Sequence, residues 1–350
     1  MGKELNTHFP DRDSERFANP ISRFNMMDGQ SPERYEDLIT GVERDDAVAA
    51  YERIAGQVPA PELVQLGGGR VLRVRKQGWE NPHSKTVTVR ALGFEGTLSK
   101  AAIGYQDYCL HEEIDGPMVT VETPGTGKSS SVDDSSLEAV ETGDFSPLSI
   151  PILEYLKASG VKRINLLGYS FGSDVATAAA INAPDYSIEV VTMFVMASPS
   201  ELERSVGELA SAELGEHGKY SEDHMHPFVP ERAVAYGYHR PAIAREMAAA
   251  KNIVSYAGRH PLHVYSYIKG MASGDGTRQR SRALGRNPNM SLVIGSTTND
   301  EVAPHVHVKD NYHELRDTYE RVRFMVFPGE DHGFEDQAET YATVAALALR

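Results

Sequence analysis

Residues 164–182 read INLLGYSFGSDVATAAAIN: an apolar segment, a serine flanked by glycines, and a run of small residues that favour a helix. The apolar part predicts a buried strand, so the chain must turn sharply into the helix at residues 168–172, GYSFG. Such a turn strains the backbone at Ser170 and requires neighbours without bulky side chains. Gly168 and Gly172 meet this requirement. The helix N-terminus would then direct backbone N–H groups toward a raised serine hydroxyl. The alternative interpretation is an ordinary turn.

Strand-like segments on both sides of this turn indicate the fold class. A hairpin with the strands ELVQL and RVLRVRKQ around the glycines of 67–69 comes first. Apolar segments at 86–92, 117–122, 164–168, 189–197, 291–295 and 321–327 then alternate with helical stretches. Strands separated by helices form βαβ units, so we expect an α/β fold with a mixed but mostly parallel sheet.

In this strand–turn–helix context, GYSFG resembles the nucleophile elbow of the α/β-hydrolase superfamily of esterases, lipases and aminopeptidases. The resemblance covers roughly residues 60–350. It implies an eight-stranded, mostly parallel sheet flanked by helices, and a serine hydrolase whose triad follows the order nucleophile, acid, histidine. Ser170 would be the nucleophile. A serine here argues against the epoxide hydrolases and dehalogenases of the superfamily, which use aspartate at this position.

The acid is expected on a loop after a later strand. Asp300 follows the strand SLVIG and, in DEVAP, resembles the D-x-x-x-P acid loop of the superfamily. Glu301 is the neighbouring alternative. Some relatives carry the acid after the preceding strand, where Glu201 is the near candidate.

The base is expected in the final loop. His332 lies in PGEDHGFED, directly after the strand RVRFMVF and one helix–strand unit beyond Asp300. Relatives place the catalytic histidine here, often beside a glycine and before an aromatic residue, as Gly333 and Phe334 provide. A serine hydroxyl needs such a base within about 3 Å, and the base needs an orienting acid. Ser170, Asp300 and His332 are therefore the predicted catalytic triad.

Two backbone N–H groups should form the oxyanion hole. One belongs to Phe171, which follows the nucleophile. The other belongs to Phe94, in the loop after the strand at 86–92. Relatives often have His-Gly-x in this loop, whereas this chain has Leu92 before Gly93. The hydrogen bonds inside the loop therefore cannot come from a histidine side chain at this position.

The stretch ETPGTGKS, residues 122–129, admits a second interpretation because it resembles the phosphate-binding loop GxxxxGK[ST]. In that interpretation Lys128 would contact nucleotide phosphates. However, Glu122 replaces the first glycine and would repel phosphate. In α/β-hydrolases the loop after the fourth strand often reads D-x-P-G-x-G-x-S, which TPGTGKS matches with Glu122 in the aspartate place. We therefore favour a structural loop.

The long helical stretch at 201–287 interrupts the strand–helix alternation. We interpret it as a helical cap inserted after the sixth strand; the alternative is longer connecting helices. The core would then comprise residues 61–200 and 288–350. Residues 1–60 read as a polar N-terminal arm followed by a helix at 32–57.

Composition limits the partners. The formal charge of −15, from 35 basic and 50 acidic residues, disfavours nucleic acid and anionic membranes as partners. Cys109 is the only cysteine, so no internal disulfide can form. The N-terminus lacks a signal-peptide pattern and no long apolar run exists, so we expect a cytoplasmic protein. Self-association into a homo-oligomer remains open.

No cofactor or metal is expected, since the triad chemistry requires neither. The pairs His224/His226 and His305/His307 could bind zinc, but neither shows a third ligand at a suitable spacing. The expected substrate is a small-molecule carboxylic ester, hydrolysed through an acyl-enzyme. Thioesters, amides and acyl transfer stay open on the same triad, as does, from another class, a non-catalytic binding protein of this fold.

Overall fold

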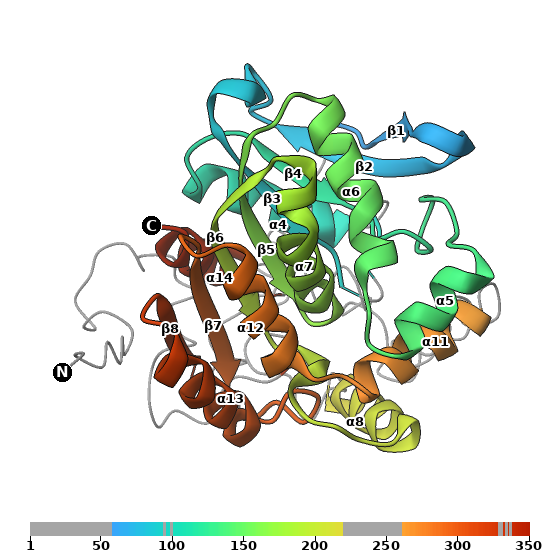
Figure 1. Cartoon of the computed structure of the whole chain (residues 1–350), viewed down its shortest axis with the longest axis vertical. Coiled ribbons are helices and arrows are strands. Elements are labelled where there is room, and N and C mark those ends of the chain that lie inside the picture. Colours follow the sequence, from blue (N-terminus) through green and yellow to red (C-terminus); the bar gives the residue numbers. More distant parts are fainter. Residues whose placement is uncertain are drawn as a thin grey trace, which may run out of the picture.

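An eight-stranded sheet forms the centre of the computed structural model, in the order β1-β2-β4-β3-β5-β6-β7-β8 (Figure 1). The structure describes residues 58–93, 96–98, 101–219, 261–327, 332, 335 and 338–350. The strands are β1 (Glu62–Gln65), β2 (Val71–Gln77), β3 (Thr86–Ala91), β4 (Met118–Val121), β5 (Arg163–Tyr169), β6 (Glu189–Met196), β7 (Ser291–Thr297) and β8 (Val322–Phe327). Each lies within or beside a segment predicted as a strand.

The pairing follows the predicted mixed pattern. Strand β2 pairs antiparallel with both β1 and β4. From β4 onward, the successive pairs in the order β4-β3-β5-β6-β7-β8 are all parallel. Parallel strands joined by helices place all their carboxyl ends at one edge of the sheet, where loops can bring distant residues together. The predicted fold class is therefore confirmed.

Helices cover both faces of the sheet. They are α4 (Ala101–Glu113), α5 (Asp134–Glu141), α6 (Ser146–Ala158), α7 (Phe171–Asn182), α8 (Val206–Lys219), α11 (Pro261–Ala272), α12 (Gly276–Arg286), α13 (His305–Thr318) and α14 (Ala338–Ala348). Helices α4 and α14 pack together, while α6, α7, α12 and α13 form a second connected layer. None of the helices in the described ranges has the length and hydropathy needed to cross a bilayer.

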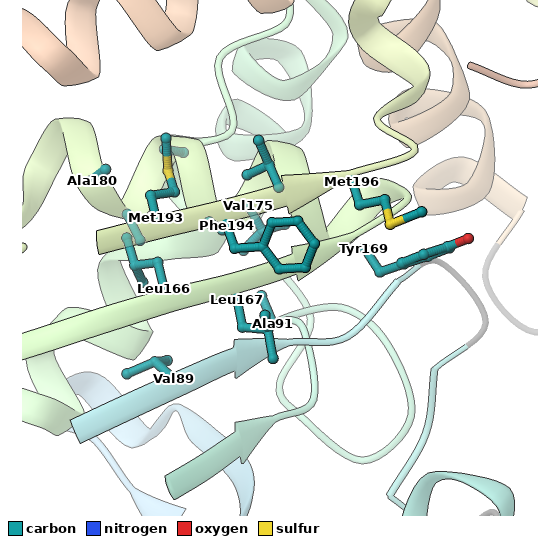
Figure 2. Close-up of a cluster of buried hydrophobic side chains, with 14 of the residues drawn as sticks. Val89, Ala91, Leu166, Leu167, Tyr169, Val175, Ala180, Met193, Phe194 and Met196 are labelled. Carbon is teal, nitrogen blue, oxygen red and sulfur yellow. The ribbon is translucent and has the colours of Figure 1, made fainter. Parts of the chain in front are cut away.

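The core lies where β3, β5 and β6 pack against α7 (Figure 2). Strand side chains such as Val89, Leu166 and Phe194 are almost fully buried. Strands covered on both faces need such apolar runs. Because α7 presents small residues, including Val175 and Ala180, it can lie close to the sheet. This packing fixes the β5–α7 junction, where the predicted nucleophile lies.

The predicted cap is described only in part, since residues 220–260 lie outside the described ranges, as does the predicted helix at 32–57. Helices α8 and α11 gather at the lower end of Figure 1, toward which the arrow of β7 points. Helix α12 falls within residues 201–287, the predicted cap, and it packs against α7 and α13. Its packing places it with the helices that flank the sheet.

Candidate active site

The junction between β5 and α7 has the geometry of a strained elbow. Ser170 has φ 50° and ψ −133°, a left-handed backbone angle that is costly for a residue with a side chain. A Cβ on Gly168 would lie 2.5 Å from the carbonyl oxygen of Gly172. A Cβ on Gly172 would lie 2.2 Å from the carbonyl oxygen of Ala91 on the neighbouring strand. Both glycines are therefore required by the close approach of backbone on either side of Ser170.

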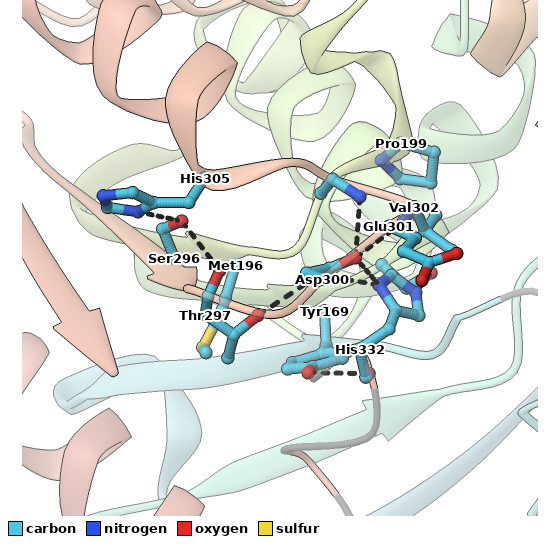
Figure 3. Close-up of polar contacts among 12 residues, drawn as sticks. Tyr169, Met196, Pro199, Ser296, Thr297, Asp300, Glu301, Val302, His305 and His332 are labelled. Carbon is cyan, nitrogen blue, oxygen red and sulfur yellow. Dashed lines mark hydrogen bonds and ion pairs between the residues drawn. The ribbon is translucent and has the colours of Figure 1, made fainter. Parts of the chain in front are cut away.

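The structure brings together the three residues predicted as a triad. The Nε2 atom of His332 lies 2.9 Å from the hydroxyl oxygen of Ser170. The other ring nitrogen, Nδ1, lies 2.9 Å from Oδ2 and 3.1 Å from Oδ1 of Asp300 (Figure 3). A neutral imidazole with its proton on Nδ1 can donate to the carboxylate and accept the serine proton at Nε2. The arrangement can thus activate the hydroxyl of Ser170.

The carboxylate of Asp300 is held independently of the histidine. Its side chain is fully buried, and Oδ1 accepts hydrogen bonds from the backbone N–H groups of Val302 at 2.8 Å and Ala303 at 2.7 Å. The hydroxyl of Thr297 donates to Oδ2 at 3.3 Å. Donors of this kind fix the orientation of the carboxylate toward His332.

The two alternative acids differ from Asp300 in exposure or in partners. Glu301 is exposed. Glu201 is buried, but its carboxylate accepts from the guanidinium of Arg280 and from the side-chain amide of Asn311 at 2.8 Å. That pairing joins α12 and α13 to the end of β6, whereas the carboxylate of Asp300 contacts His332.

Of the two predicted oxyanion donors, Phe171 is described and Phe94 lies outside the described residues. Phe171 is the first residue of α7, where backbone N–H groups point out of the helix N-terminus. A Cβ on Gly93 would lie 3.4 Å from the carbonyl oxygen of Tyr169, so the loop after β3 passes directly beside the elbow. The hydroxyl of Thr123 donates to the carbonyl oxygen of Leu92 at 2.9 Å, which ties this loop to the end of β4 despite the missing histidine.

The loop after β4 is organised around the buried side chain of Glu122. One carboxylate oxygen accepts from the backbone N–H of Leu98 at 3.0 Å and the hydroxyl of Thr97 at 2.6 Å. The other accepts from the backbone N–H groups of Lys128 at 2.5 Å and Ser129 at 3.2 Å. A phosphate-binding loop would direct such N–H groups at a phosphate, whereas here an internal carboxylate receives them. The structure therefore supports the structural-loop interpretation.

Sequence reasoning did not select Tyr169, the second residue of the GYSFG motif. Its hydroxyl donates a hydrogen bond of 2.9 Å to the backbone carbonyl oxygen of His332 (Figure 3). The motif constrains only the glycines and the serine, so it carries no signal for the role of this side chain.

Of the two histidine pairs, the one at 305 and 307 lies in the part of the chain that the structure describes. The Nδ1 atom of His305 lies 3.0 Å from the hydroxyl of Ser296, and its ring stacks on Phe324. Burial, and then the charge of Lys309, lower the pKa of His305. The pair at 224 and 226 lies outside the described residues, among which no cluster of three or more metal-ligating side chains occurs.

Comparisons with known proteins identify the fold of this chain. It matches no family model. Among curated proteins it is similar to the dihydrolipoyllysine-residue acetyltransferase component of an acetoin cleaving system from Pseudomonas putida, with 26% identity over 159 residues, or 45% of this chain. The alignment covers 39% of that relative, so the similarity spans about two fifths of its length.

Three solved structures each match more than four fifths of this chain. A bromoperoxidase from Bacillus anthracis has a TM-score of 0.57 at 12% identity, covering 83% of this chain and 99% of its own. A serine hydrolase from Cycloclasticus zankles has a TM-score of 0.56 at 14% identity, covering 82% and 96%. An α/β-hydrolase enzyme from a Medee basin deep-sea metagenome has a TM-score of 0.55 at 12% identity, covering 82% and 96%. Identities this low concern the fold alone, and together with the strand order and the elbow they show that this chain has the α/β-hydrolase fold.

Proposed function

We propose that the protein is a serine hydrolase that cleaves a carboxylic ester of a small molecule through an acyl-enzyme intermediate. One observation carries the proposal: the imidazole of His332 bridges the hydroxyl of Ser170 and the buried carboxylate of Asp300, with 2.9 Å on each side. The strained backbone of Ser170, at the N-terminus of α7, supports it further.

The reaction follows from this geometry. The oxygen of Ser170 attacks the ester carbonyl carbon while His332 takes its proton, and Asp300 stabilises the imidazolium that forms. The backbone N–H groups of Phe171 and Phe94 would bind the oxyanion of the tetrahedral intermediate. Its collapse breaks the ester C–O bond, and His332 returns the proton to the leaving alcohol. A water molecule, deprotonated by His332, then attacks the acyl-enzyme and releases the acid and the free serine.

The proposal extends to the cofactors, the partners and the cellular location of the protein. The steps use only groups of this chain, so we propose no cofactor and no metal. The single cysteine, the buried Cys109, and the acidic composition suit a cytoplasmic protein that acts on a small molecule rather than on nucleic acid or membrane. Helices α8 and α11, as part of a cap, would close one side of the substrate pocket.

Acyl transfer to an acceptor other than water is the second candidate. The curated relative is named as an acetyltransferase component, although the alignment covers less than half of either chain. The same acyl-enzyme would form first, and only the second nucleophile would differ. Adding alcohols, amines or thiols to the assay and identifying the acyl product separates the two reactions.

A panel of nitrophenyl esters of increasing acyl length tests the proposal. We expect turnover by the wild type, and losses in kcat on the order of 10⁴-fold or more for Ser170→Ala, His332→Ala and Asp300→Asn, with each variant still folded. His313→Ala, which changes an exposed histidine of α13, is the matched control and should retain activity. Turnover that survives in His332→Ala would overturn the proposed mechanism.

Mg-ATP provides a test of the nucleotide-binding alternative. Because the N–H groups of Lys128 and Ser129 are directed at Glu122, we expect no change in the melting temperature when Mg-ATP is added. A saturable increase would favour the phosphate-loop interpretation.

A further inference from the structure

We propose that an ion pair between the buried Arg90 and the partly buried Glu335, together with the hydroxyl of Tyr169, positions His332 for catalysis, an inference that rests on the proposed serine hydrolase function. In this account Arg90, Glu335 and Tyr169 are positioning residues: they touch neither the substrate nor the reacting atoms.

The first anchor holds the backbone of the histidine itself. Tyr169 is buried, and its hydroxyl donates to the carbonyl oxygen of His332 at 2.9 Å. The two rings lie 6.0 Å apart between centroids, and Tyr169 also meets Tyr341 of α14 edge-on at 5.5 Å. Tyr169 directly precedes Ser170, so one residue links the strained elbow to the backbone of the base.

The second anchor lies three residues further along the chain. The guanidinium of Arg90, whose side chain is 1% exposed, donates to the carboxylate of Glu335. The side-chain amide of Gln106 on α4 donates to the backbone carbonyl oxygen of Glu335 at 3.2 Å. Glu335 is thus held through both its side chain and its backbone. Arg90 comes from β3, whose register pairs it with Leu167 of β5, so it points to the same sheet face as Tyr169.

The Arg90–Glu335 pair balances the charge of a buried cluster. Two buried arginines, Arg75 and Arg90, share the carboxylate of Asp107, at 2.6 Å and 2.7 Å. One carboxylate cannot neutralise two guanidinium groups, and an unpaired buried charge is strongly destabilising. Glu335 supplies the second negative charge. Burial lowers the pKa of Arg90, but the carboxylates of Glu335 and Asp107 together raise it by more than burial lowers it. The pKa of Arg90 therefore lies above its ordinary value.

The cluster therefore favours a state in which Glu335 is drawn toward β3. His332 is close to Glu335 in the chain, so the same attraction holds the imidazole beside Ser170. A displacement of about 1 Å of a catalytic group can reduce a rate by about 100-fold. Loss of either anchor should therefore lower kcat more than it changes KM.

The test compares three variants in the full chain. Glu335→Gln removes the charge while keeping the shape, and Tyr169→Phe removes a single oxygen atom. Thr120→Val is the matched control, because the hydroxyl of Thr120 donates to Asp107 at 2.6 Å in the same cluster but does not contact Glu335. We expect Glu335→Gln and Tyr169→Phe to lower kcat by about tenfold to 100-fold with KM within about twofold, and Thr120→Val to leave kcat within about twofold.

A second readout separates this inference from the proposed function. The low-field proton NMR signal of the Nδ1 proton of His332 reports its contact with Asp300 whether or not the protein turns over an ester. We expect this signal to broaden or vanish in Glu335→Gln and Tyr169→Phe and to persist in Thr120→Val. If the wild type neither hydrolyses esters nor reacts with a fluorophosphonate, the proposed function fails, and the signal alone decides whether the anchors hold His332.

Two results would overturn the positioning role. One is an unchanged kcat and an unchanged signal in both Glu335→Gln and Tyr169→Phe. The other is an equal loss in Thr120→Val, which would show that any weakening of the buried cluster has the same effect. If Glu335→Gln fails to fold, Tyr169→Phe, which leaves every charge in place, decides alone.

Discussion

Tyr267 of α11 stacks on Phe171, the residue that follows the proposed nucleophile, with ring centroids 5.2 Å apart and planes 26° from parallel. Tyr267 is fully buried, and its hydroxyl donates to the carbonyl oxygen of Pro124 at 2.8 Å. Part of the predicted cap region is thereby fixed both to the elbow and to the loop after β4.

This contact predicts a graded loss of stability at Tyr267. Tyr267→Phe removes one buried hydrogen bond and should cost about 0.5–1.5 kcal/mol, whereas Tyr267→Ala should cost about 3–5 kcal/mol because it leaves a cavity beside Phe171. Urea denaturation measures both. Tyr265→Ala, on the same helix but half-exposed, is the control, with an expected change within about 0.5 kcal/mol. Equal losses at the two tyrosines would show that the stacking is unimportant.

The elbow glycines predict a steric effect. In Gly172→Ala the new Cβ, on helix α7, would lie 2.2 Å from the carbonyl oxygen of Ala91 on β3, a contact with backbone that no side-chain rotation can relieve. We expect a loss of more than about 3 kcal/mol, or failure to fold, and no reactivity at Ser170. Gly207→Ala in α8 has no heavy atom within 4 Å of the new Cβ and should be neutral or slightly stabilising in thermal melts. A stable and reactive Gly172→Ala is the opposing outcome.

Asp174 predicts a dependence of stability on pH. This residue of α7 accepts from the hydroxyl of Ser198 at 2.9 Å. Burial raises its pKa from 3.8 to about 7, although the charge of Arg280 acts in the opposite direction. The folded protein therefore keeps a proton that the unfolded chain releases near pH 3.8, so this group weakens folding as pH rises toward about 7.

Asp174→Asn should remove that effect. We expect the melting temperature of the variant, relative to the wild type, to rise between about pH 4 and pH 7 and to change little above that range. Asp185→Asn, at an exposed carboxylate, is the control and should follow the wild-type curve. A difference between Asp174→Asn and the wild type that is independent of pH would show that Asp174 is charged throughout this range.

The side chain of Glu122 accepts hydrogen bonds from both the loop after β3 and the loop after β4. In Glu122→Gln the neutral amide keeps one acceptor oxygen, so the donors at one end of the side chain lose their acceptor, and buried Arg73 loses the negative charge that lies 3.2 Å away. We expect a loss of about 1–3 kcal/mol in the free energy of unfolding. Glu189→Gln, in the exposed pair with Arg163, should change it by less than about 1 kcal/mol. Similar values for both variants would refute the special role of Glu122.

The elements of the sheet could be predicted because local patterns determine them. The apolar segment before GYSFG and the small residues after it identify β5 and α7 without any long-range information. The positions of Asp300 and His332 followed from the chain order of the resembling superfamily. The structure places His332 in contact with Ser170, and Asp300 in contact with His332.

The buried charges could not be predicted in the same way. Arg73, Arg75 and Arg90 lie on strands, where an alternating charged residue usually indicates a solvated face. Their burial depends on partners far along the chain: Glu335 lies 245 residues after Arg90. The pairing of Glu201 with Arg280, across 79 residues, is equally invisible in the sequence. Only the packing of α4, α12 and α14 onto the sheet brings these charges together.

The most direct test of the central claim is covalent labelling by a fluorophosphonate, read by intact mass and by peptide mapping of the modified residue. The account predicts one label per chain, on Ser170, in the wild type and in Ser211→Ala, an exposed-serine control, with none in Ser170→Ala and far slower labelling in His332→Ala. A label on any other residue, or labelling of His332→Ala at the wild-type rate, would contradict it.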